Sequence, residues 1–149
     1  MAKKVETSLA AVTHRLSRLF TQALADEIKA SGVAPGQFSV LACLWDQDGL
    51  TQRDLYQRLN IEQATMYNTL ARMERDNLIK RKPDANDRRA SRIHLTAHAK
   101  KLERDLTAGA KAVNKRALGA LNARDKKALL GLMGDMVKNL EPEADEPPP

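Results

Sequence analysis

The chain has 149 residues, of which 42% are hydrophobic but only 3% aromatic, and its formal net charge is +6. This length suits one domain whose core is built mainly from aliphatic side chains. The final nine residues carry four acids and no base, so setting them apart leaves +10 on residues 1–140. A net charge of this size on residues 1–140 favours polyanionic partners, although a positive net charge can equally serve only to keep a protein soluble.

The cysteine content and the hydropathy pattern exclude several classes of protein. A single cysteine, Cys43, excludes an internal disulfide and a cysteine-rich zinc site, and it fits a reducing compartment. The basic N-terminus lacks the continuous apolar stretch of a signal peptide, and no window has the composition of a membrane span. We therefore expect a soluble cytoplasmic protein without membrane partners.

No pattern in the chain indicates catalysis or a bound cofactor. His14, His94 and His98 lack the spacing of metal ligands, and the first two are expected on the surface. No carboxylate pair, nucleophile constellation or glycine-rich phosphate loop is apparent. We expect neither an enzyme nor a metal or cofactor site.

The first helix is predicted over residues 8–30, where apolar residues recur at three- and four-residue intervals and Gly32 ends the pattern. Pro35-Gly36 is expected to separate it from a second helix, which ends near Asp48-Gly49. That second helix is marked by Phe38, Leu41, Leu44 and Trp45.

Residues 51–75 have the pattern of a helix-turn-helix. Thr51 and Asp54 have the spacing of a capping box, and the following helix turns Leu55 and Leu59 inward. A short turn at 60–61 then leads into a helix with an apolar seam of Met66, Leu70 and Met73. The opposite side of that helix carries Gln63, Ala64, Tyr67, Asn68, Ala71 and Arg75, with Arg72 beside it.

Residues 77–96, NLIKRKPDANDRRASRIHLT, predict a basic β-hairpin. Two β-type runs, Leu78–Lys82 and Arg92–Leu95, flank a polar loop. The loop carries Asp84, Asn86, Asp87, Arg88 and Arg89. A helix-turn-helix followed directly by such a hairpin suggests a winged lobe, over residues 37–96, that holds a nucleic-acid duplex at two places.

Long amphipathic helices are predicted on both sides of this lobe. Thr96 can cap a helix over 97–121, and Asn122 with Asp125 repeats the capping spacing before a helix over 123–140. The small lobe cannot cover all of these apolar stripes, so a second copy of the chain is expected to do so. We expect one domain over 8–140 with dimerisation helices at 8–31 and 97–140, a flexible segment at 1–7 and a disordered acidic, proline-rich tail at 141–149. The fold class is mainly α with a small β-hairpin wing (α+β).

The expected chemistry is recognition of double-stranded DNA. The second helix of a helix-turn-helix enters the major groove, where Gln63 and Asn68 can hydrogen-bond adenine edges. The hairpin would reach the minor groove, whose negative potential attracts one arginine of the Arg88-Arg89 pair while Asp87 braces the loop. The further candidate contacts are Thr65 to a base or a phosphate, Tyr67 to apolar base atoms, Arg72 to a phosphate, and Gln52 and Arg53 to the DNA backbone.

The stretch LYQRLNIEQATMYNTLARMERDNLIKRKPDANDRRASRIHLT resembles the winged-helix core of the MarR family of bacterial regulators. The matching elements are Met73-Glu74, Asn77-Leu78-Ile79-Lys80-Arg81, Asp87-Arg88-Arg89 and Leu95-Thr96, and with the flanking helices the likeness covers residues 8–140. This chain has Asn77 and Ala99 where the family often has glycine, and Asn68 where arginine is common, so its operator cannot be copied from relatives.

The resemblance implies a homodimer that binds a pseudo-palindromic operator, usually as a repressor, with Arg89 in the minor groove and Arg88 on a phosphate. It also implies a small phenolic or other lipophilic effector that binds between the dimer helices and the DNA-binding lobe and releases the DNA. Two other functions stay open: a winged helix that binds proteins, and a DNA-binding activator or architectural protein without an inducer.

Cys43 allows two interpretations. One MarR branch senses oxidants through a cysteine, but that cysteine usually lies in the first helix. Cys43 stands between Leu41 and Leu44 with no basic residue adjoining it to lower its pKa. Packing as a small hydrophobic residue is the favoured interpretation.

Overall fold

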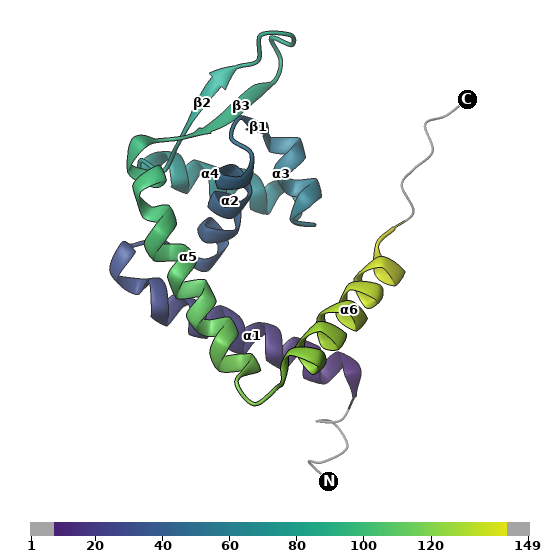
Figure 1. Cartoon of the computed structure of the whole chain (residues 1–149). Helices are drawn as coiled ribbons and strands as arrows, with labels where there is room; N and C mark the ends of the chain where they lie inside the picture. Colours follow the sequence, from purple (N-terminus) through teal and green to yellow (C-terminus); the bar gives the residue numbers. More distant parts are fainter. Residues whose placement is uncertain (1–7, 143–149) are drawn as a thin grey trace, which may run out of the picture. The chain divides into compact units, whose positions relative to one another are not determined.

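The computed structural model describes residues 8–142, which form helices and one small antiparallel sheet (Figure 1). In chain order the elements are α1 (Leu9–Ile28), the 3-10 turn η2 (Lys29–Ser31), α2 (Pro35–Asp46), β1 (Leu50–Thr51), α3 (Gln52–Arg58), α4 (Gln63–Arg75), β2 (Ile79–Pro83), β3 (Ser91–Leu95), α5 (Ala97–Leu118) and α6 (Ala123–Leu140). Two compact units are present, one reaching Val113 and one beginning at Asn114, and each is described by itself. The expected helical fold with a hairpin wing is confirmed, whereas the segments expected to be flexible at 1–7 and, beyond residue 142, in the tail lie outside the described residues.

The first two helices meet at a turn that the sequence predicted only in part. Gly32 does end the first helical segment, because it adopts a left-handed φ of 74° that side-chain-bearing residues rarely tolerate. The expectation that Pro35 separates the helices was wrong, since Pro35 is the first residue of α2. Proline is well suited there because its φ is already helical and its missing N–H would have no partner in the first turn.

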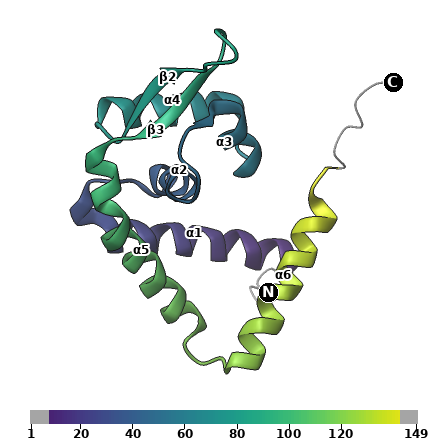
Figure 2. The same ribbon diagram turned by 45° about the horizontal axis from the view of Figure 1, so that its top comes forward.

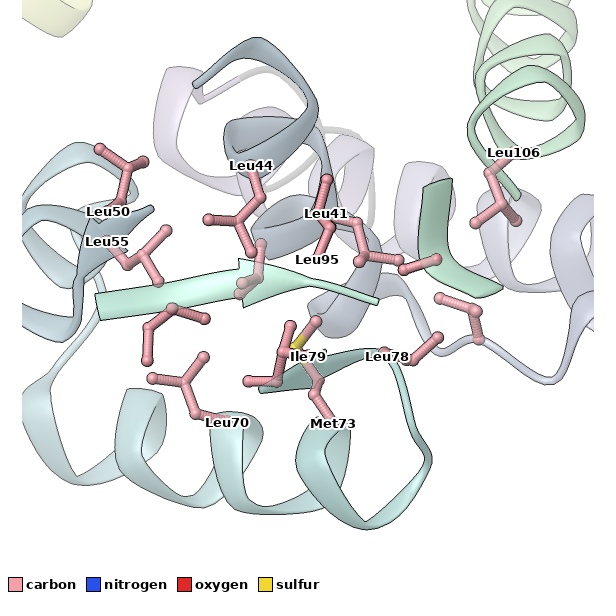
Figure 3. Packing of buried hydrophobic residues seen from close by; sticks show 14 of the residues in the cluster. Leu41, Leu44, Leu50, Leu55, Leu70, Met73, Leu78, Ile79, Leu95 and Leu106 are labelled. Atoms are coloured by element: carbon pink, nitrogen blue, oxygen red, sulfur yellow. The ribbon is translucent and has the colours of Figure 1, made fainter. Parts of the chain in front are cut away.

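The core of the first unit lies between helices on both sides of β3 (Figure 3). From α4, the predicted seam residues Met66, Leu70 and Met73 are all completely buried. From α2, Leu41 and Leu44 pack on the opposite side of the strand. This packing fixes the rotation of α4 about its own axis, and it therefore fixes which side chains of α4 face outward.

The sheet has three antiparallel strands in the order β1-β3-β2. β2 and β3 form the predicted hairpin, with Ile79 opposite Leu95 and Pro83 opposite Ser91 (Figure 2). The third strand was not expected: β1 comprises only two residues, and Leu50 pairs with Ile93. β1 immediately precedes α3, so this pairing joins the middle of β3 to the start of the helix-turn-helix.

Thr96 occupies the junction between β3 and α5. Its Oγ1 accepts the backbone N–H of Ala99 at 3.1 Å, which confirms the predicted helix cap, and it donates to the carbonyl of Asn77 at 2.8 Å. Trp45 of α2 donates from Nε1 to the carbonyl of Ala99 at 3.2 Å. α5 is thus tied at its beginning to both the wing and α2.

Farther along α5, a glycine permits close contact with α1. A Cβ built at Gly109 would lie 3.1 Å from Cγ2 of Ile28, so the two helices approach closely at this point. α5 ends at Leu118, three residues before the predicted end at 121.

The last helix, α6, forms most of the second unit. Oδ1 of Asn122 accepts the N–H of Asp125 at 2.8 Å, as the capping pattern predicted. None of its residues is buried, and Leu130, Leu132 and Leu140 are among its exposed apolar side chains. Across residues 8–142, no helix combines the length and apolarity needed to traverse a bilayer.

Candidate nucleic-acid interface

The helix-turn-helix is held by a reciprocal cap and a left-handed turn residue. Thr51 Oγ1 accepts the N–H of Asp54 at 3.1 Å, while Asp54 Oδ2 accepts the N–H of Thr51 at 2.9 Å, as the capping-box spacing predicted. The hydrogen bond from the Thr51 N–H is the main reason why the pKa of Asp54 is lowered. Asn60 then adopts a φ of 50°, and Ile61 N–H bonds to the Tyr56 carbonyl at 3.0 Å to close the turn.

The outward face of α4 carries the candidate base-reading side chains. All of the predicted contacts on this helix are exposed: Gln63, Thr65, Tyr67, Asn68 and Arg72. Gln63 Nε2 also donates to the hydroxyl of Tyr56 at 3.0 Å, which links the start of α4 to α3. The buried seam and the exposed polar face are therefore separated on opposite sides of the helix, as the spacing predicted.

The two candidates at the start of α3 differ in their surroundings. Arg53 is exposed and makes no ion pair within the described part of the chain. Gln52 is half-buried, and its Oε1 accepts a hydrogen bond from Nη1 of Arg81 at 3.4 Å. Gln52 is thus engaged with the wing in addition to lying at the helix N-terminus.

The wing tip is shaped by two aspartates that fold the loop back on itself. Asp87 Oδ1 accepts the N–H of Arg89 at 2.9 Å, and Asp84 Oδ1 accepts the N–H of Asn86 at 3.1 Å. These are Asx-type turns, in which a short side chain bonds the backbone two residues ahead. Arg88 and Arg89 are both exposed at this tip.

Asp84 is a wing residue whose role the sequence interpretation did not identify. It faces Arg92, with 3.4 Å between Arg92 Nε and Asp84 Oδ1, and the Asn86 N–H is the main cause of the lowered pKa of Asp84. The signal was present in the sequence as an aspartate two residues before Asn86, the spacing of an Asx turn. Asp84 therefore supports the loop together with Asp87.

A second feature that the sequence interpretation missed lies between α4 and β2. A shallow depression is lined there by Tyr67, Ala71, Glu74, Arg75 and Arg81. Nε of Arg81 donates to Oε2 of Glu74 at 3.0 Å, whereas Arg75 pairs with its neighbour Asp76 at 3.0 Å.

Asp76 also connects this end of α4 to the core. Its Oδ2 accepts from Nε2 of Gln37, a buried residue of α2, at 3.1 Å. The Oε1 atom of the same glutamine accepts the N–H of Ala34 at 3.2 Å. The hydrogen bonds from Arg75 and then from Gln37 lower the pKa of Asp76.

His94 alternates with the buried residues Ile93 and Leu95, as the strand pattern predicted, but it is not a fully exposed surface residue. It is half-buried, with its Nδ1 3.5 Å from Oδ2 of Asp48, and a Cβ at Gly49 would lie 3.0 Å from its Cε1. The difference arises because the loop before β1 runs beside this strand, which sequence alternation cannot reveal. Within residues 8–142, no group of three or more metal-ligating side chains is assembled.

Cys43 lies on α2 and is half-buried against the core. Burial is the main cause of the raised pKa of its thiol, and it outweighs the opposing influence of Arg58. A thiol in this state is a poor nucleophile at neutral pH, because the thiolate is the reactive form. The environment agrees with the packing interpretation.

The comparisons with known proteins agree with this architecture. The family model described as MarR family matches residues 33–91, from just before α2 to the first residue of β3. The transcriptional regulator HosA of Escherichia coli is 29% identical over 83% of this chain and 93% of its own length. The transcriptional repressor NicR of Pseudomonas putida is 29% identical over 70% of this chain and 66% of its own length.

Among solved structures, the chain is similar to MepR of S. aureus, determined as a DNA complex. The two are 26% identical with a TM-score of 0.84, and the match covers 91% of this chain and all of the MepR chain. The winged-helix architecture is therefore shared along almost the whole length. The chain is thus similar to MarR-family transcriptional regulators, and the family-model match spans residues 33–91 of its winged lobe.

Proposed function

We propose that the chain binds a specific double-stranded DNA operator, with α4 in the major groove and the wing tip in the adjacent minor groove. The observation that carries this proposal is the combination of a polar, exposed face on α4 and a braced arginine loop on the same lobe. Asn68 and Gln63 would read base edges, and Arg89 would enter the minor groove because its narrow walls concentrate negative potential.

The remaining candidate residues would hold the duplex in register. Arg72, Arg88 and Arg53 would bind phosphates, since arginine presents a fork of N–H donors that matches phosphate oxygens. Thr65, Tyr67 and Gln52 complete the proposed contact set, and Asp87 supports the loop. MepR, which is 26% identical, was solved in complex with DNA, and this supports the proposed partner.

We further propose that the regulator is a repressor acting in the cytoplasm. The relative NicR is named as a transcriptional repressor, and repression follows physically when a bound protein excludes polymerase from an overlapping promoter. The expected result is that deleting the gene raises transcription of the genes beside the operator. A fall in their transcription would instead identify an activator.

The proposed functional form is a homodimer on a pseudo-palindromic operator. α1 exposes Leu9, Leu16 and Leu19, with 40% or more of each side chain accessible, and α6 has no buried residue. Apolar faces of this extent are normally covered, and a second copy can cover them with two-fold symmetry. We therefore propose that residues 8–31 and 97–140 mediate dimerisation and that residues 37–96 bind DNA. Sedimentation at micromolar concentration that shows only the 16.5 kDa chain would overturn the dimer.

A small phenolic or other lipophilic molecule is the proposed effector, as the family resemblance implies. Such a ligand releases DNA only if it binds the DNA-free conformation more tightly than the DNA-bound one. A panel of phenolic carboxylates titrated into the protein–DNA complex tests the proposal, and release by at least one compound is expected. If none of the panel dissociates the complex or binds the free protein, this effector class is wrong.

Two substitutions test the docking. Arg89→Ala should weaken binding to many sequences alike and lower the slope of log affinity against log salt by about 1, whereas Asn68→Ala should change the preference among bases. The DNA is a duplex recovered by the unmodified protein from genomic fragments. The exposed residue Ala42 of α2 provides a control, Ala42→Ser, that should bind as the parent does. Parent-like binding by both Arg89→Ala and Asn68→Ala would contradict the proposed docking.

A further inference from the structure

We propose that Arg81 is a positioning residue that sets the placement of the wing relative to the recognition helix α4. This inference rests on the proposed DNA-binding function, because it concerns how the two groove-reading elements are kept at a fixed separation. Arg81 was not among the DNA contacts expected from the sequence, and its role follows from two contacts, with Glu74 and with Gln52, that the fold brings together.

Arg81 joins all three elements of the proposed interface. It is carried by β2; its Nε donates to Glu74 at the end of α4 at 3.0 Å, and its Nη1 donates to Gln52 at the start of α3 at 3.4 Å. The Arg81 side chain is 27% exposed, so it is held against the protein and does not extend freely into solvent.

No second ion pair links the hairpin to α4 within residues 8–142. Arg92 pairs with Asp84 inside the hairpin and also donates from Nη1 to the carbonyl of Gly49, just before β1, at 2.9 Å. His94 Nδ1 lies 3.5 Å from Asp48 Oδ2, also near β1 and away from α4. The apolar anchors Leu78 and Ile79 lie at the base of β2, before Arg81. The Arg81–Glu74 ion pair, called the tie below, is therefore the polar contact nearest to the tip on the side of the hairpin that faces α4.

The position of this tie along the hairpin determines how far the wing tip moves when the tie is lost. Each residue of a strand advances the chain by about 3.3 Å, so a small rotation at Arg81 is magnified at the tip, where Arg89 lies. A duplex fixes the separation of its major and minor grooves. A wing that samples many orientations would lose part of its minor-groove contact to conformational entropy.

Direct phosphate binding by Arg81 is the competing explanation. Its Nη2 group makes no hydrogen bond within the described residues, and the depression that it lines is open. However, the carboxylate of Glu74 lies 3.0 Å from Nε of Arg81 and would repel a phosphate in the same place. A positioning role for Arg81 involves no such repulsion, because Glu74 is then the partner that holds Arg81 in place.

Substitution of Glu74 distinguishes the two roles by the sign of its effect. If Arg81 positions the wing, Glu74→Met weakens DNA binding because the tie is lost. If Arg81 binds a phosphate, Glu74→Met strengthens binding because a like charge leaves the site. Stronger binding by Glu74→Met would therefore overturn the proposal.

A double-mutant cycle measures whether Arg81 acts through the wing. Against the recovered duplex, Arg89→Ala is expected to weaken binding about tenfold in the parent but less than about threefold when Arg81→Met is also present. The matched control is Arg75→Met, which removes a cation lining the same depression but whose partner is its chain neighbour. The full effect of Arg89→Ala should persist in that control. Where Arg89→Ala weakens DNA binding by the parent, an equal weakening in the Arg81→Met variant would overturn the proposal.

A measurement without DNA separates failure of this inference from failure of the proposed function. Spin labels are placed at Ala85 in the wing loop and at Ala42 on α2, after Cys43→Ser, with unlabelled protein in excess so that distances within one chain are recorded. Arg81→Met should broaden the distance distribution at least about twofold, and Arg75→Met should leave it unchanged. An unchanged distribution in Arg81→Met overturns the positioning role, whatever the DNA experiments show. A broadened distribution with no effect of Arg89→Ala on DNA binding supports the tie and contradicts only the proposed docking.

Discussion

Replacing Thr96 with valine tests how the wing, the recognition helix and α5 are held together. The Thr96 hydroxyl accepts the N–H of Ala99 at 3.1 Å and donates to the carbonyl of Asn77 at 2.8 Å, in a residue that is only 6% exposed. Valine has nearly the same shape but can make neither hydrogen bond. The change therefore isolates the hydroxyl from the packing of the side chain.

The expected loss in the free energy of unfolding is about 2 kcal/mol. Loss of a helix cap typically costs about 1 kcal/mol, and a partly buried carbonyl left without its donor costs about 1 kcal/mol more. Thr96→Ser keeps the hydroxyl and removes one methyl group, whose burial is worth about 0.8 kcal/mol. Valine should thus be the more harmful of the two substitutions, although it is the more hydrophobic.

Urea unfolding followed by circular dichroism measures both variants beside the parent. The protein concentration must be equal throughout, because the apparent stability of the proposed dimer would depend on concentration. The transition midpoint should fall in the order parent, Thr96→Ser, Thr96→Val, with similar denaturant slopes. If Thr96→Ser is the less stable variant, the methyl packing dominates and the reasoning from the hydroxyl is wrong.

Three further substitutions test the interpretation of individual residues. Gly49→Ala should lower the free energy of unfolding, measured by denaturation, by about 1–2 kcal/mol, because φ is +77° at this position. Adding His94→Ala removes the ring that the new Cβ would contact, so it should restore only the part of the loss caused by that contact and not the part caused by backbone strain. The hydrogen bonds from Thr51 lower the pKa of Asp54, so the ionised carboxylate stabilises the fold at neutral pH, and this stabilisation is lost as the pH falls below about 4. In Asp54→Asn, the free energy of unfolding should therefore fall less steeply between neutral and acidic pH. Burial raises the pKa of the Cys43 thiol, so alkylation of Cys43 should be slower in the folded than in the unfolded chain. The packing role would be contradicted if peroxide abolished DNA binding by the parent but not by Cys43→Ser.

Much of the fold could be predicted because its signals are local. The spacing of Met66, Leu70 and Met73 identified the buried side of α4, and all three are fully buried. The paired spacing of Thr51 and Asp54 identified the start of α3. Periodicity and capping are properties of neighbouring residues, so they are visible before any tertiary contact is known.

The features that were missed depend on partners far away in the chain. β1 has two residues, too few for an alternating pattern, and it exists because Leu50 pairs with Ile93. Asp48 accepts the N–H of Leu95 at 2.9 Å and faces His94, and neither contact leaves a local signature. Arg81 could be assigned to the hairpin from its sequence, but its contact with Gln52 could not be foreseen.

The same limitation applies to charge, because counting basic residues does not show which are available to DNA. Arg72 and Arg75 both lie near the end of α4 and are exposed, yet only Arg75 is ion-paired, with Asp76, within the described residues. A phosphate that approaches Arg75 must compete with this carboxylate, whereas at Arg72 it meets no such competitor. Arg72→Ala should therefore reduce the slope of log affinity against log salt by about 0.9, the value for one lost phosphate contact, and Arg75→Ala should change that slope much less. Equal reductions in the two variants would mean that the ion pair opens freely on DNA and that formal charge is, after all, the better guide.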